Sequence, residues 1–388
     1  MTSSQARSRI YLDHNATTPV RPEVADEMSR VLRGVHGNPS SVHAEGAAAR
    51  ALVEEARRQV AACLGVESRE VFFTAGATEA NNTVLRGVAG DPSASGPLVI
   101  STTEHPSVVE PAAWLEAAGV DVRRIPVDGE GLLDLAAFEA ALEDAPALVS
   151  LIWANNETGV LQPMERIAEL TRERGLLLHV DATQAVGKVE VDLSAVPADF
   201  LSSSAHKLGG PKGVGCLVVR EGRAVAPLLL GGPQERRWRG GTENVSGIAG
   251  FAVACDLARK ELHERQVGYA ALRDRLWRGI EAAVPRVRRN GHSEQVLPNT
   301  LNVEFRDTPG EVLVEALDLE GVAVSAGAAC HSGSVFPSHV LAAMGRSAEE
   351  ARGSVRFSVG HGVTQEQVDR VVELLGPLVE RVRQSGGG

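Results

Sequence analysis

The sequence predicts an α/β fold in which a largely parallel sheet is covered by helices on both faces. Two observations carry this prediction. Short runs of aliphatic and β-branched residues alternate with stretches of helical periodicity through much of the chain, which is typical of parallel strands joined by helical crossovers. The chain also has 388 residues, more than one typical domain, and we therefore expect a large domain and a smaller one.

The elements of the large domain follow in order along the chain. The first helix is expected over residues 22–34, because Val24, Met28 and Val31 recur on one face and Gly34 ends the pattern. Two further helical patterns cover 51–65 and 163–175. Buried strands are predicted where apolar runs of strand length occur, at 97–102, 147–153, 176–181, 198–204 and 213–219.

A long charged helix from about Leu257 to Val284 is predicted to connect the two domains. A smaller α+β domain is indicated by the patterns that follow it, at 300–305, 312–321, 322–327 and 355–360. We place the boundary near Ala258. The large domain is then expected to span 17–258, and the small domain to combine 1–16 with 259–388.

Composition and charge exclude several classes of function. The net charge of -11 argues against non-specific binding of nucleic acid or anionic membranes, since both need a cationic surface. The first residues lack the apolar core of a signal peptide, and no run approaches the roughly 18 apolar residues of a membrane span. We therefore expect a cytoplasmic protein with no direct nucleic-acid or membrane partner.

The four cysteines are far apart and form no C-x-x-C motif, so neither a metal site nor a disulfide framework is predicted. They are Cys63, Cys216, Cys255 and Cys330. Cys63 and Cys216 belong to a helical and a strand pattern and are expected to be buried as small apolar side chains. Cys330 differs because it lies in a run of small and polar residues, 325–334, that suits an exposed loop.

Polar side chains of the large domain gather directly after the predicted strands. In open α/β sheets the carboxyl ends of the strands form the ligand-binding edge, and the sequence therefore predicts one cleft there. The residues concerned are Thr103, Glu104 and His105; Asn155, Asn156 and Glu157; Asp181 and Gln184; and Ser204, His206 and Lys207.

Two nucleotide-binding signatures are not found in the sequence. The stretch "AVGKVE" around Lys188 lacks the upstream glycine and the following Ser or Thr of a P-loop, and no G-x-G-x-x-G follows the first strand. A small phosphate instead suits "FTAGATEANN" (73–82), where a helix is expected to begin after Gly76 with free backbone N–H groups and the Thr78 hydroxyl. Thr78 is also compatible with a helix N-cap that holds no ligand.

The stretch "SSSAHKLGGPKGVG" (202–215) places Lys207 at the end of a buried strand, where an unused amine is costly. A lysine, a carboxylate, a histidine that stacks on a ring and a phosphate cradle are together the groups that pyridoxal 5'-phosphate requires. Lys207, Asp181, His105 and the 73–82 segment therefore indicate a site for this cofactor.

Ten motifs make the chain resemble the cysteine desulfurases of the NifS and IscS type, in the class-V aminotransferase group of pyridoxal-phosphate enzymes. They are "YLDHNATTP", "GNPSSVH", "FTAGATEANN", "EH", "NNETGVLQP", "HVDATQAVGK", "SSSAHKLGGPKGVG", "GGPQERRWRGGTEN", "SAGAACHSGS" and "VRFSVG", in the family's order and over nearly the whole chain. The resemblance implies fold type I, in which the large domain has a mainly parallel seven-stranded sheet and the smaller domain is α+β.

The resemblance also implies roles for individual residues. Lys207 is similar to the lysine that holds the cofactor covalently, Asp181 to the partner of its ring nitrogen, and His105 to the group that stacks on the ring and moves a proton. Thr242 resembles a threonine that reaches the phosphate bound by a neighbouring subunit, which implies a homodimer. Further cofactor contacts are implied for Ala77, Thr78, Asn156, Gln184, Ser204 and His206, and substrate contacts for Asn38, Asn156 and Arg356.

Cys330 decides the reaction that the resemblance implies. Its thiolate takes the sulfur of L-cysteine, which leaves L-alanine and an enzyme persulfide for transfer to an acceptor protein. His331 follows directly and recurs in selenocysteine lyases, so that activity is the nearest alternative. A class-V lyase or aminotransferase with an incidental cysteine and a non-enzymatic relative also remain, although Lys207 and Cys330 together disfavour the last.

The acceptor stays open. It can belong to iron–sulfur cluster assembly, tRNA thiolation, DNA sulfur modification or a biosynthetic sulfur carrier.

Overall fold

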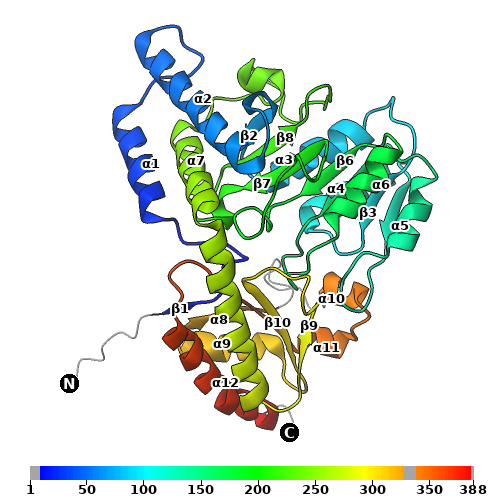
Figure 1. The fold of residues 1–388 in the computed structure, drawn as a ribbon, viewed down its shortest axis with the longest axis vertical. Helices are drawn as coiled ribbons and strands as arrows, with labels where there is room; N and C mark the ends of the chain where they lie inside the picture. Colours follow the sequence, from blue (N-terminus) through cyan, green and yellow to red (C-terminus); the bar gives the residue numbers. More distant parts are fainter. Residues whose placement is uncertain (1–8, 327–337, 386–388) are drawn as a thin grey trace.

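A seven-stranded sheet forms the centre of the large domain (Figure 1). The structure is a computed structural model that describes residues 9–326 and 338–385. The strands follow the order β2-β8-β7-β6-β5-β3-β4. The neighbours from β7 through β6, β5 and β3 to β4 pair in parallel, and β8 runs antiparallel to its neighbours β2 and β7. The mainly parallel sheet is therefore confirmed. Its strands are β2 Val71–Thr74, β3 Leu98–Ser101, β4 Val122–Ile125, β5 Leu148–Ile152, β6 Leu178–Asp181, β7 Phe200–Ser204 and β8 Gly215–Val219.

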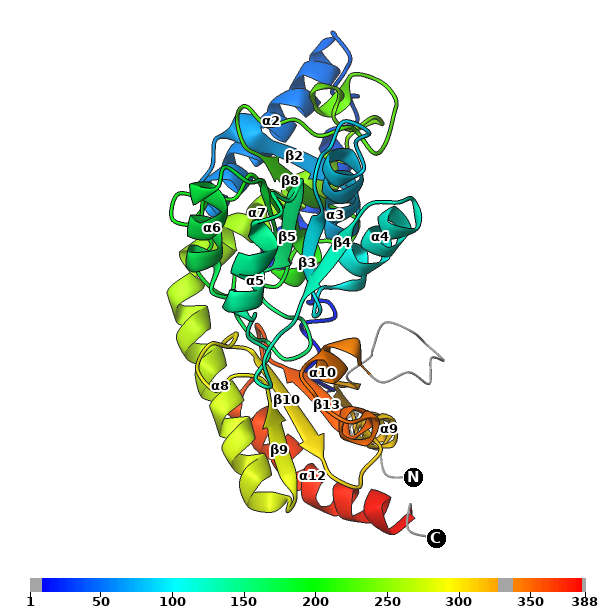
Figure 2. The same cartoon turned by 90° about the vertical axis from the view of Figure 1, so that its right-hand side faces the viewer.

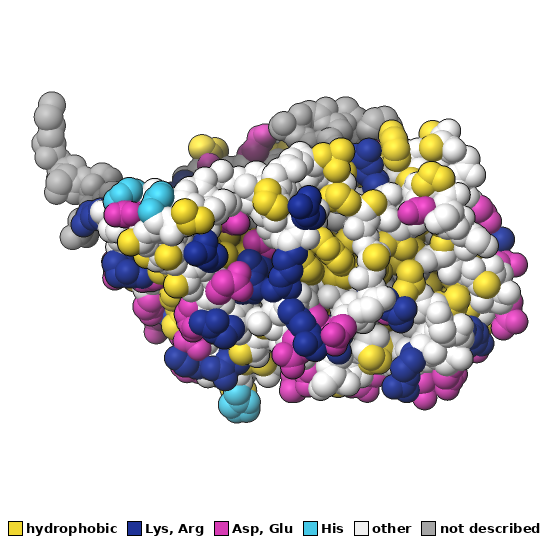
Figure 3. Space-filling view, turned by 90° about the horizontal axis from the view of Figure 1, so that it is seen from above, with side chains coloured by type: hydrophobic (Ala, Val, Ile, Leu, Met, Phe, Trp, Pro, Cys, Tyr) yellow, Lys and Arg dark blue, Asp and Glu magenta, His cyan; other side chains and the backbone are white. Residues whose placement is uncertain are grey.

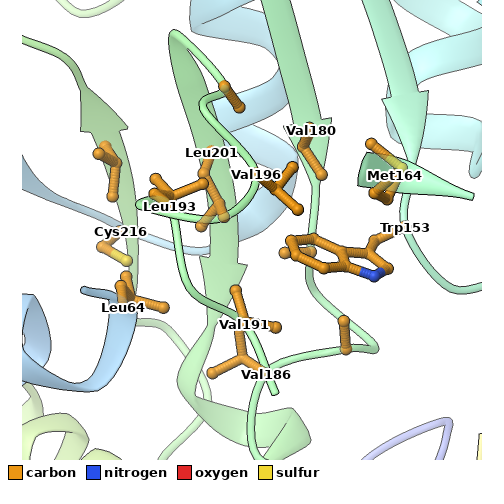
Figure 4. Close-up of a cluster of buried hydrophobic side chains, with 14 of the residues drawn as sticks. Leu64, Trp153, Met164, Val180, Val186, Val191, Leu193, Val196, Leu201 and Cys216 are labelled. Carbon is orange, nitrogen blue, oxygen red and sulfur yellow. The ribbon is translucent and has the colours of Figure 1, made fainter. Parts of the chain in front are cut away.

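Helices cover both faces of this sheet because successive strand residues point to opposite sides. Leu98 and Ile100 of β3 join an apolar cluster with α3 and α4, whereas Val99 joins the cluster of α2, α5, α6 and α7. Leu201 and Cys216 lie in the second cluster beside Leu64 of α2 (Figure 4). The helices are α1 Pro22–Gly34, α2 Ala44–Leu64, α3 Ala77–Val84, α4 Pro106–Ala117, α5 Leu135–Leu142, α6 Met164–Glu173 and α7 Val245–Lys260.

Short helical turns connect several of these elements. Three are 3-10 helices, η1 Ser68–Glu70, η3 Ala205–Lys207 and η4 Gln234–Arg237, and one is a π-helical turn, η2 Leu85–Ala89, that extends α3. η3 matters most for the site, because it follows β7 directly and ends at Lys207.

The connector between the two sheets is two helices and not the single helix expected from Leu257 to Val284. α7 ends at Lys260, and α8 runs from Leu262 to Ala283 towards the small sheet (Figure 1). Glu261 lies between them and accepts hydrogen bonds from Arg21 at 2.8 and 3.1 Å and from Arg265 at 2.9 Å. These ion pairs tie the junction to the segment before α1, a contact that the charge pattern alone could not reveal.

A second, smaller sheet lies beside α8, α9 and α12 (Figure 2). Its strands pair antiparallel in the order β12-β13-β10-β9, and they enclose an apolar core with α8, α9 and α12. The elements are β9 Val287–Asn290, β10 Thr300–Phe305, α9 Gly310–Leu319, β12 Ser325–Ala326, α10 His339–Ala343, α11 Ala348–Arg352, β13 Ser354–Ser358 and α12 Gln365–Ser385.

The start of the described chain returns to this smaller unit. β1 (Ile10–Tyr11) pairs in parallel with β11 (Val322–Ala323), and Ile10 and Leu12 belong to the same apolar core as α8 and α12. We therefore keep the division into 17–258 and 1–16 with 259–388 as a proposal. In the described parts of the chain, every helix is too short or too polar to cross a membrane.

Candidate active site

Most of the predicted strand-end residues line one cavity of about 1270 Å³, but Thr103, Glu104 and Asn155 are not among its lining residues. The parallel strands β3, β5, β6 and β7 all end at this edge of the sheet, and the small domain contributes Arg356 of β13. The walls include these residues of the sequence prediction: Ala77, Thr78, His105, Asn156, Asp181, Gln184, Ser204, His206, Lys207 and Arg356.

Lys207 reaches the cavity from η3, immediately after β7. Its Nζ donates hydrogen bonds to the carbonyl oxygens of Asn15, at 2.7 Å, and Ala16, at 2.8 Å. The same N-terminal segment is fixed to the lysine turn by Thr18, whose N–H and hydroxyl both donate to the carbonyl of His206. The amine is therefore held at the cavity wall by backbone carbonyls of a segment more than 190 positions earlier in the sequence.

Asp181 ends β6 and is almost completely buried. Its Oδ2 accepts a 2.7 Å hydrogen bond from Nδ2 of Asn81, and its Oδ1 accepts from the N–H of Thr183 at 3.0 Å. Each carboxylate oxygen thus has its own donor. The carboxylate is fixed in orientation before any ligand is bound.

His105 caps the N-terminus of α4, where Pro106 takes the first helical position. Its Nδ1 accepts from the N–H of Ser107 at 3.1 Å, so the neutral ring carries its proton on Nε2. Burial lowers the pKa of His105; the carboxylate of Asp181 opposes this effect, and Lys207 adds to it. A neutral ring with a defined tautomer therefore lies at the cavity.

The start of α3 forms a cradle of donors. The N–H groups of Ala77 and Thr78 lie in the first turn, where no earlier helical carbonyl can accept from them. Gly76 precedes them with a φ of 153°, and a Cβ at this position would approach Ser204 Oγ to 3.6 Å. A Cβ at Gly76 would make ordinary contact with Ser204 and fill part of the space in front of the helix start, where the free N–H groups suit an anion.

His206 borders the same region and donates or accepts at Nδ1 with the Thr17 hydroxyl, 3.1 Å away. Burial, and then the nearby charges of Lys207, Lys212 and Lys188, lower the pKa of His206 to about 4. The ring is consequently neutral at physiological pH, and it offers hydrogen bonds to a ligand without adding a charge.

Arg356 enters from β13 and is buried. Its guanidinium pairs with Asp13 at 2.6 Å and donates to the carbonyl of Asn156 at 2.9 Å. Its Nε is a buried atom with no hydrogen-bond partner among the described residues. Thr183, which also lines the cavity, has a buried Oγ1 that likewise lacks a hydrogen-bond partner among the described residues. Buried donors of this kind are costly unless a ligand uses them.

Comparison with known proteins decides the family. The class-V aminotransferase family model matches residues 10–371. A cysteine desulfurase from Cereibacter sphaeroides is 47% identical over 378 residues, which cover 97% of both chains. The chain belongs to the cysteine desulfurase family.

Solved structures agree with this family assignment. A NifS-like protein superposes with a TM-score of 0.90 at 37% identity, over 96% of this chain and 100% of the other. SspA in complex with cysteine superposes with a TM-score of 0.80 at 32% identity, over 90% and 98% of the two chains. The predicted family and the fold-type-I architecture are both confirmed.

Cysteine desulfurases are pyridoxal-phosphate enzymes of the class-V group, and the described cavity has the groups that this cofactor needs. It offers an amine (Lys207), a buried and oriented carboxylate (Asp181), a neutral ring (His105) and the donor cradle at α3. The cradle would be narrowed by a Cβ at Gly76, and Thr183 Oγ1 remains without a partner. The residues present therefore fit the cofactor.

Two predicted site residues, Asn38 and Thr242, are not among the residues that line the cavity. Asn38 is exposed, and its side chain and carbonyl accept from the N–H groups of Ser40 and Ser41 in a turn away from the cavity. Thr242 is exposed and does not line the cavity of its own chain. Cys330 lies outside the described residues. The roles assigned to these three residues stay predictions.

The sequence reasoning missed the residues that hold the site residues in place. Asn81 is fully buried and bridges Asp181 to the Ser107 hydroxyl, at 2.7 and 2.8 Å. Ser107 Oγ in turn lies 2.8 Å from His105 Nδ1. The signal for Asn81 was its position three residues after Thr78, which places both on neighbouring turns of one helix. Asn15 lies in the motif "YLDHNATTP", but no local pattern predicts its contacts, since they come from distant segments.

Proposed function

We propose that this protein is a cytoplasmic cysteine desulfurase. It removes sulfur from L-cysteine with pyridoxal 5'-phosphate, releases L-alanine and holds the sulfur as a persulfide on Cys330 for an acceptor protein. The convergence of Lys207, Asp181 and His105 on one cavity is the observation that carries the proposal. The family assignment supports it, and so does the structural relative that is described in complex with cysteine.

Lys207 would bind the cofactor through Nζ, Asp181 would face its ring nitrogen, and Ala77, Thr78, Ser204 and His206 would surround its phosphate. When bound, this cofactor links to the substrate amino group and withdraws electrons from the α-carbon. Asp181 would support that withdrawal by pairing with the protonated ring nitrogen, since Asn81 and Thr183 fix its carboxylate in orientation. Gln184 and Asn156 would lie beside the ring and the substrate.

His105 is suited to carry a proton at Nε2, because Nδ1 is engaged by Ser107 and the pKa is lowered by burial. Arg356 would bind the substrate carboxylate, for which its partnerless Nε is available. The Asp13 and Asn156 contacts hold the guanidinium plane at the cavity. The substrate is thereby bound at its carboxylate and positioned for proton transfer beside His105.

Cys330 would complete the reaction as the nucleophile. Its thiolate forms an S–S bond with the substrate sulfur while the bond between Cβ and that sulfur breaks. The electron pair of the broken bond remains with the carbon fragment, which takes up a proton and leaves as alanine. The sulfur stays on Cys330 and passes to the acceptor.

We further propose a homodimer in which Thr242 serves the site of the partner subunit. Thr242 follows η4, on the segment that also exposes Leu229 and Leu230. Seen from above, this end of the molecule has hydrophobic side chains gathered near its middle, with charged groups among and around them (Figure 3). Such a patch favours a protein contact.

The proposed function is tested with the wild-type protein and Cys330→Ser. Wild type is expected to absorb in the near-visible after pyridoxal phosphate is added and to release alanine from L-cysteine with formation of a protein persulfide. Cys330→Ser should keep the absorption and lose both products. Alanine and sulfide at the wild-type rate from Cys330→Ser would remove the persulfide step and favour an incidental cysteine. Alanine formed by this variant from selenocysteine alone would favour the lyase alternative.

A further inference from the structure

Lys188 is a buried lysine for which the proposed mechanism has no use. It is 4% exposed, and it follows the turn after β6. Gly187 precedes it with a φ of 76°, and a Cβ there would meet the Cβ atoms of Ala258 and Leu208 at 3.1 and 3.2 Å. This tight left-handed turn suits glycine alone and directs the chain so that Lys188 is buried.

The contacts of Lys188 are to neutral groups. Its Nζ donates to Oε1 of Gln184 and to Oδ1 of Asn15, the latter at 3.2 Å. Among the described residues no carboxylate forms a salt bridge with it. Burial, and then the charges of Lys207 and Arg356, hold the pKa of Lys188 well below its usual range. An amine placed here serves as a hydrogen-bond donor and not as an ion-pair partner.

Asn15 is the centre of the network to which Lys188 belongs. Its carbonyl oxygen accepts from Lys207 Nζ at 2.7 Å and from Gln184 Nε2 at 2.9 Å. Its side-chain Oδ1 accepts from Lys188 and from Asn299 Nδ2, and its Nδ2 donates to Thr300 Oγ1 at 2.8 Å. Asn15 therefore joins the lysine of the site to residues of the small domain.

Lys188 and the Asn15 carbonyl hold the Gln184 amide from its two sides. Because Nζ donates to Oε1, the NH₂ group of Gln184 must point to the Asn15 carbonyl, where it is found at 2.9 Å. Without Lys188 the amide oxygen loses this donor, and the amide is held from one side only, by the bond from its NH₂ group to the Asn15 carbonyl. The Asn15 side chain would lose a partner at the same time. Both changes act on the carbonyl oxygen that holds Lys207 Nζ.

We propose that Lys188 is a positioning residue of the site. Its amine fixes the Gln184 amide and the Asn15 side chain, and through them the position of Lys207 Nζ. This inference rests on the proposed function, in which Lys207 and Gln184 face the cofactor. The competing explanation is that Lys188 only fills space beneath the site.

The test replaces Lys188 by Met, which keeps an unbranched side chain of similar length and removes the donor. The cofactor-free variant is expected to unfold within a few degrees of wild type. Its affinity for added pyridoxal phosphate, from absorbance titration, should fall by about tenfold, the size expected from one lost hydrogen bond. The absorption band of the bound cofactor should shift. The turnover number should fall while the KM for cysteine stays unchanged, since Arg356 is not touched.

Two further variants make the result specific. Lys260→Met removes an exposed lysine at the end of α7, which pairs with Asp256 at 2.6 Å, and should leave affinity and spectrum as in wild type. Asn15→Ala removes the other acceptor of Lys188 but keeps the carbonyl. It should weaken cofactor binding in the same way. The loss of binding free energy in the double variant should be smaller than the sum of the losses in the two single variants.

The proposal is overturned if Lys188→Met lowers thermal stability but binds pyridoxal phosphate with wild-type affinity and spectrum. If Lys188→Met does not fold, a wild-type affinity and spectrum in Asn15→Ala overturns it instead. Failure of the wild-type protein itself to bind the cofactor would count against the proposed function, and the two failures are thus distinguishable.

Discussion

Asn81 Nδ2 donates a 2.7 Å hydrogen bond to Oδ2 of Asp181, and both residues are buried. Because the second amide hydrogen goes to the Ser107 hydroxyl, the Asn81 side chain cannot turn without losing a bond. The carboxylate that would face the cofactor is therefore oriented by a residue of α3, the helix whose start forms the donor cradle.

We expect Asn81→Leu to weaken binding of pyridoxal phosphate by about tenfold or more, because a hydrogen bond to a buried charge contributes about 1.5–3 kcal/mol. The measurement is absorbance titration of the cofactor-free protein. Asn290→Leu is the matched control, since Asn290 is as buried but bonds Asn302 and Ser354 in the small sheet. Equal affinities in Asn81→Leu and wild type would refute the assignment.

Replacement of Arg356 by Lys is expected to raise the KM for cysteine by at least about tenfold, because a single ammonium cannot make a two-pronged contact with a carboxylate. The near-visible absorption of the bound cofactor should be retained. Steady-state kinetics and absorbance spectra measure the two effects separately. An unchanged KM would show that the guanidinium serves only its contacts with Asp13 and the Asn156 carbonyl.

We expect Glu104 to contribute to the pH dependence of the free energy of unfolding. Burial raises the pKa of Glu104 from 4.5 to about 8, although hydrogen bonds from Ser101 and the Ile152 N–H oppose the shift. Between these values the folded chain keeps a proton that the unfolded chain releases. Glu104 therefore makes the free energy of unfolding fall as pH rises through this window, by about 1.4 kcal/mol per pH unit.

Glu104→Gln should remove this slope, because an amide does not titrate. Urea unfolding of wild type and variant at two pH values inside the window gives the comparison. The free energy of unfolding of the variant, relative to that of wild type, should be larger at the higher pH than at the lower pH. Parallel changes in both proteins would mean that Glu104 titrates normally in the folded chain.

A buried ion pair anchors the segment that leads to Thr242. Glu235 accepts from Arg57 at 2.7 and 2.9 Å and from the N–H of Phe73 at 2.9 Å. Glu235→Gln should cost about 3 kcal/mol in the free energy of unfolding, since it leaves the Arg57 charge buried without its main partner. Glu55→Gln, which breaks an exposed pair with Arg58 on the same helix, should cost less than about 1 kcal/mol. Similar losses in both variants, measured by denaturant titration, would contradict the assignment.

The parts of the site that follow from local chain direction were predictable. Asp181 ends β6, His105 and Lys207 follow shortly after β3 and β7, and the parallel arrangement brings these strand ends to one edge. The contacts that hold them were not predictable from the sequence. The bond from Asn81 to Asp181 depends on how α3 packs against β6, and the bond from Lys207 to Asn15 joins residues that are 192 positions apart in the sequence.

The same distinction applies to the fold. Apolar runs indicated the strands, because a strand buried on both faces has a composition that few other elements share. The break between α7 and α8 lies at Glu261, which pairs with Arg265 at helical i,i+4 spacing and also with Arg21, 240 positions away in the sequence. No periodicity encodes the contact with Arg21. The predicted role of Thr242 cannot be seen in the fold of one chain, since that role requires a second chain.

The pairing of β1 with β11 has a consequence for how the protein is made. Ile10 and Tyr11 pair with Val322 and Ala323. The strand β1 therefore leaves the ribosome early but can pair only after β11 has been synthesised, near the end of translation. The large sheet can close around Lys207 earlier, because its strands end at Val219. Asn15, which follows the first strand closely, is then held in place late. A nascent chain interrupted before Val322 would have a folded sheet but a loosely held lysine, and the site would be completed only when synthesis is almost finished.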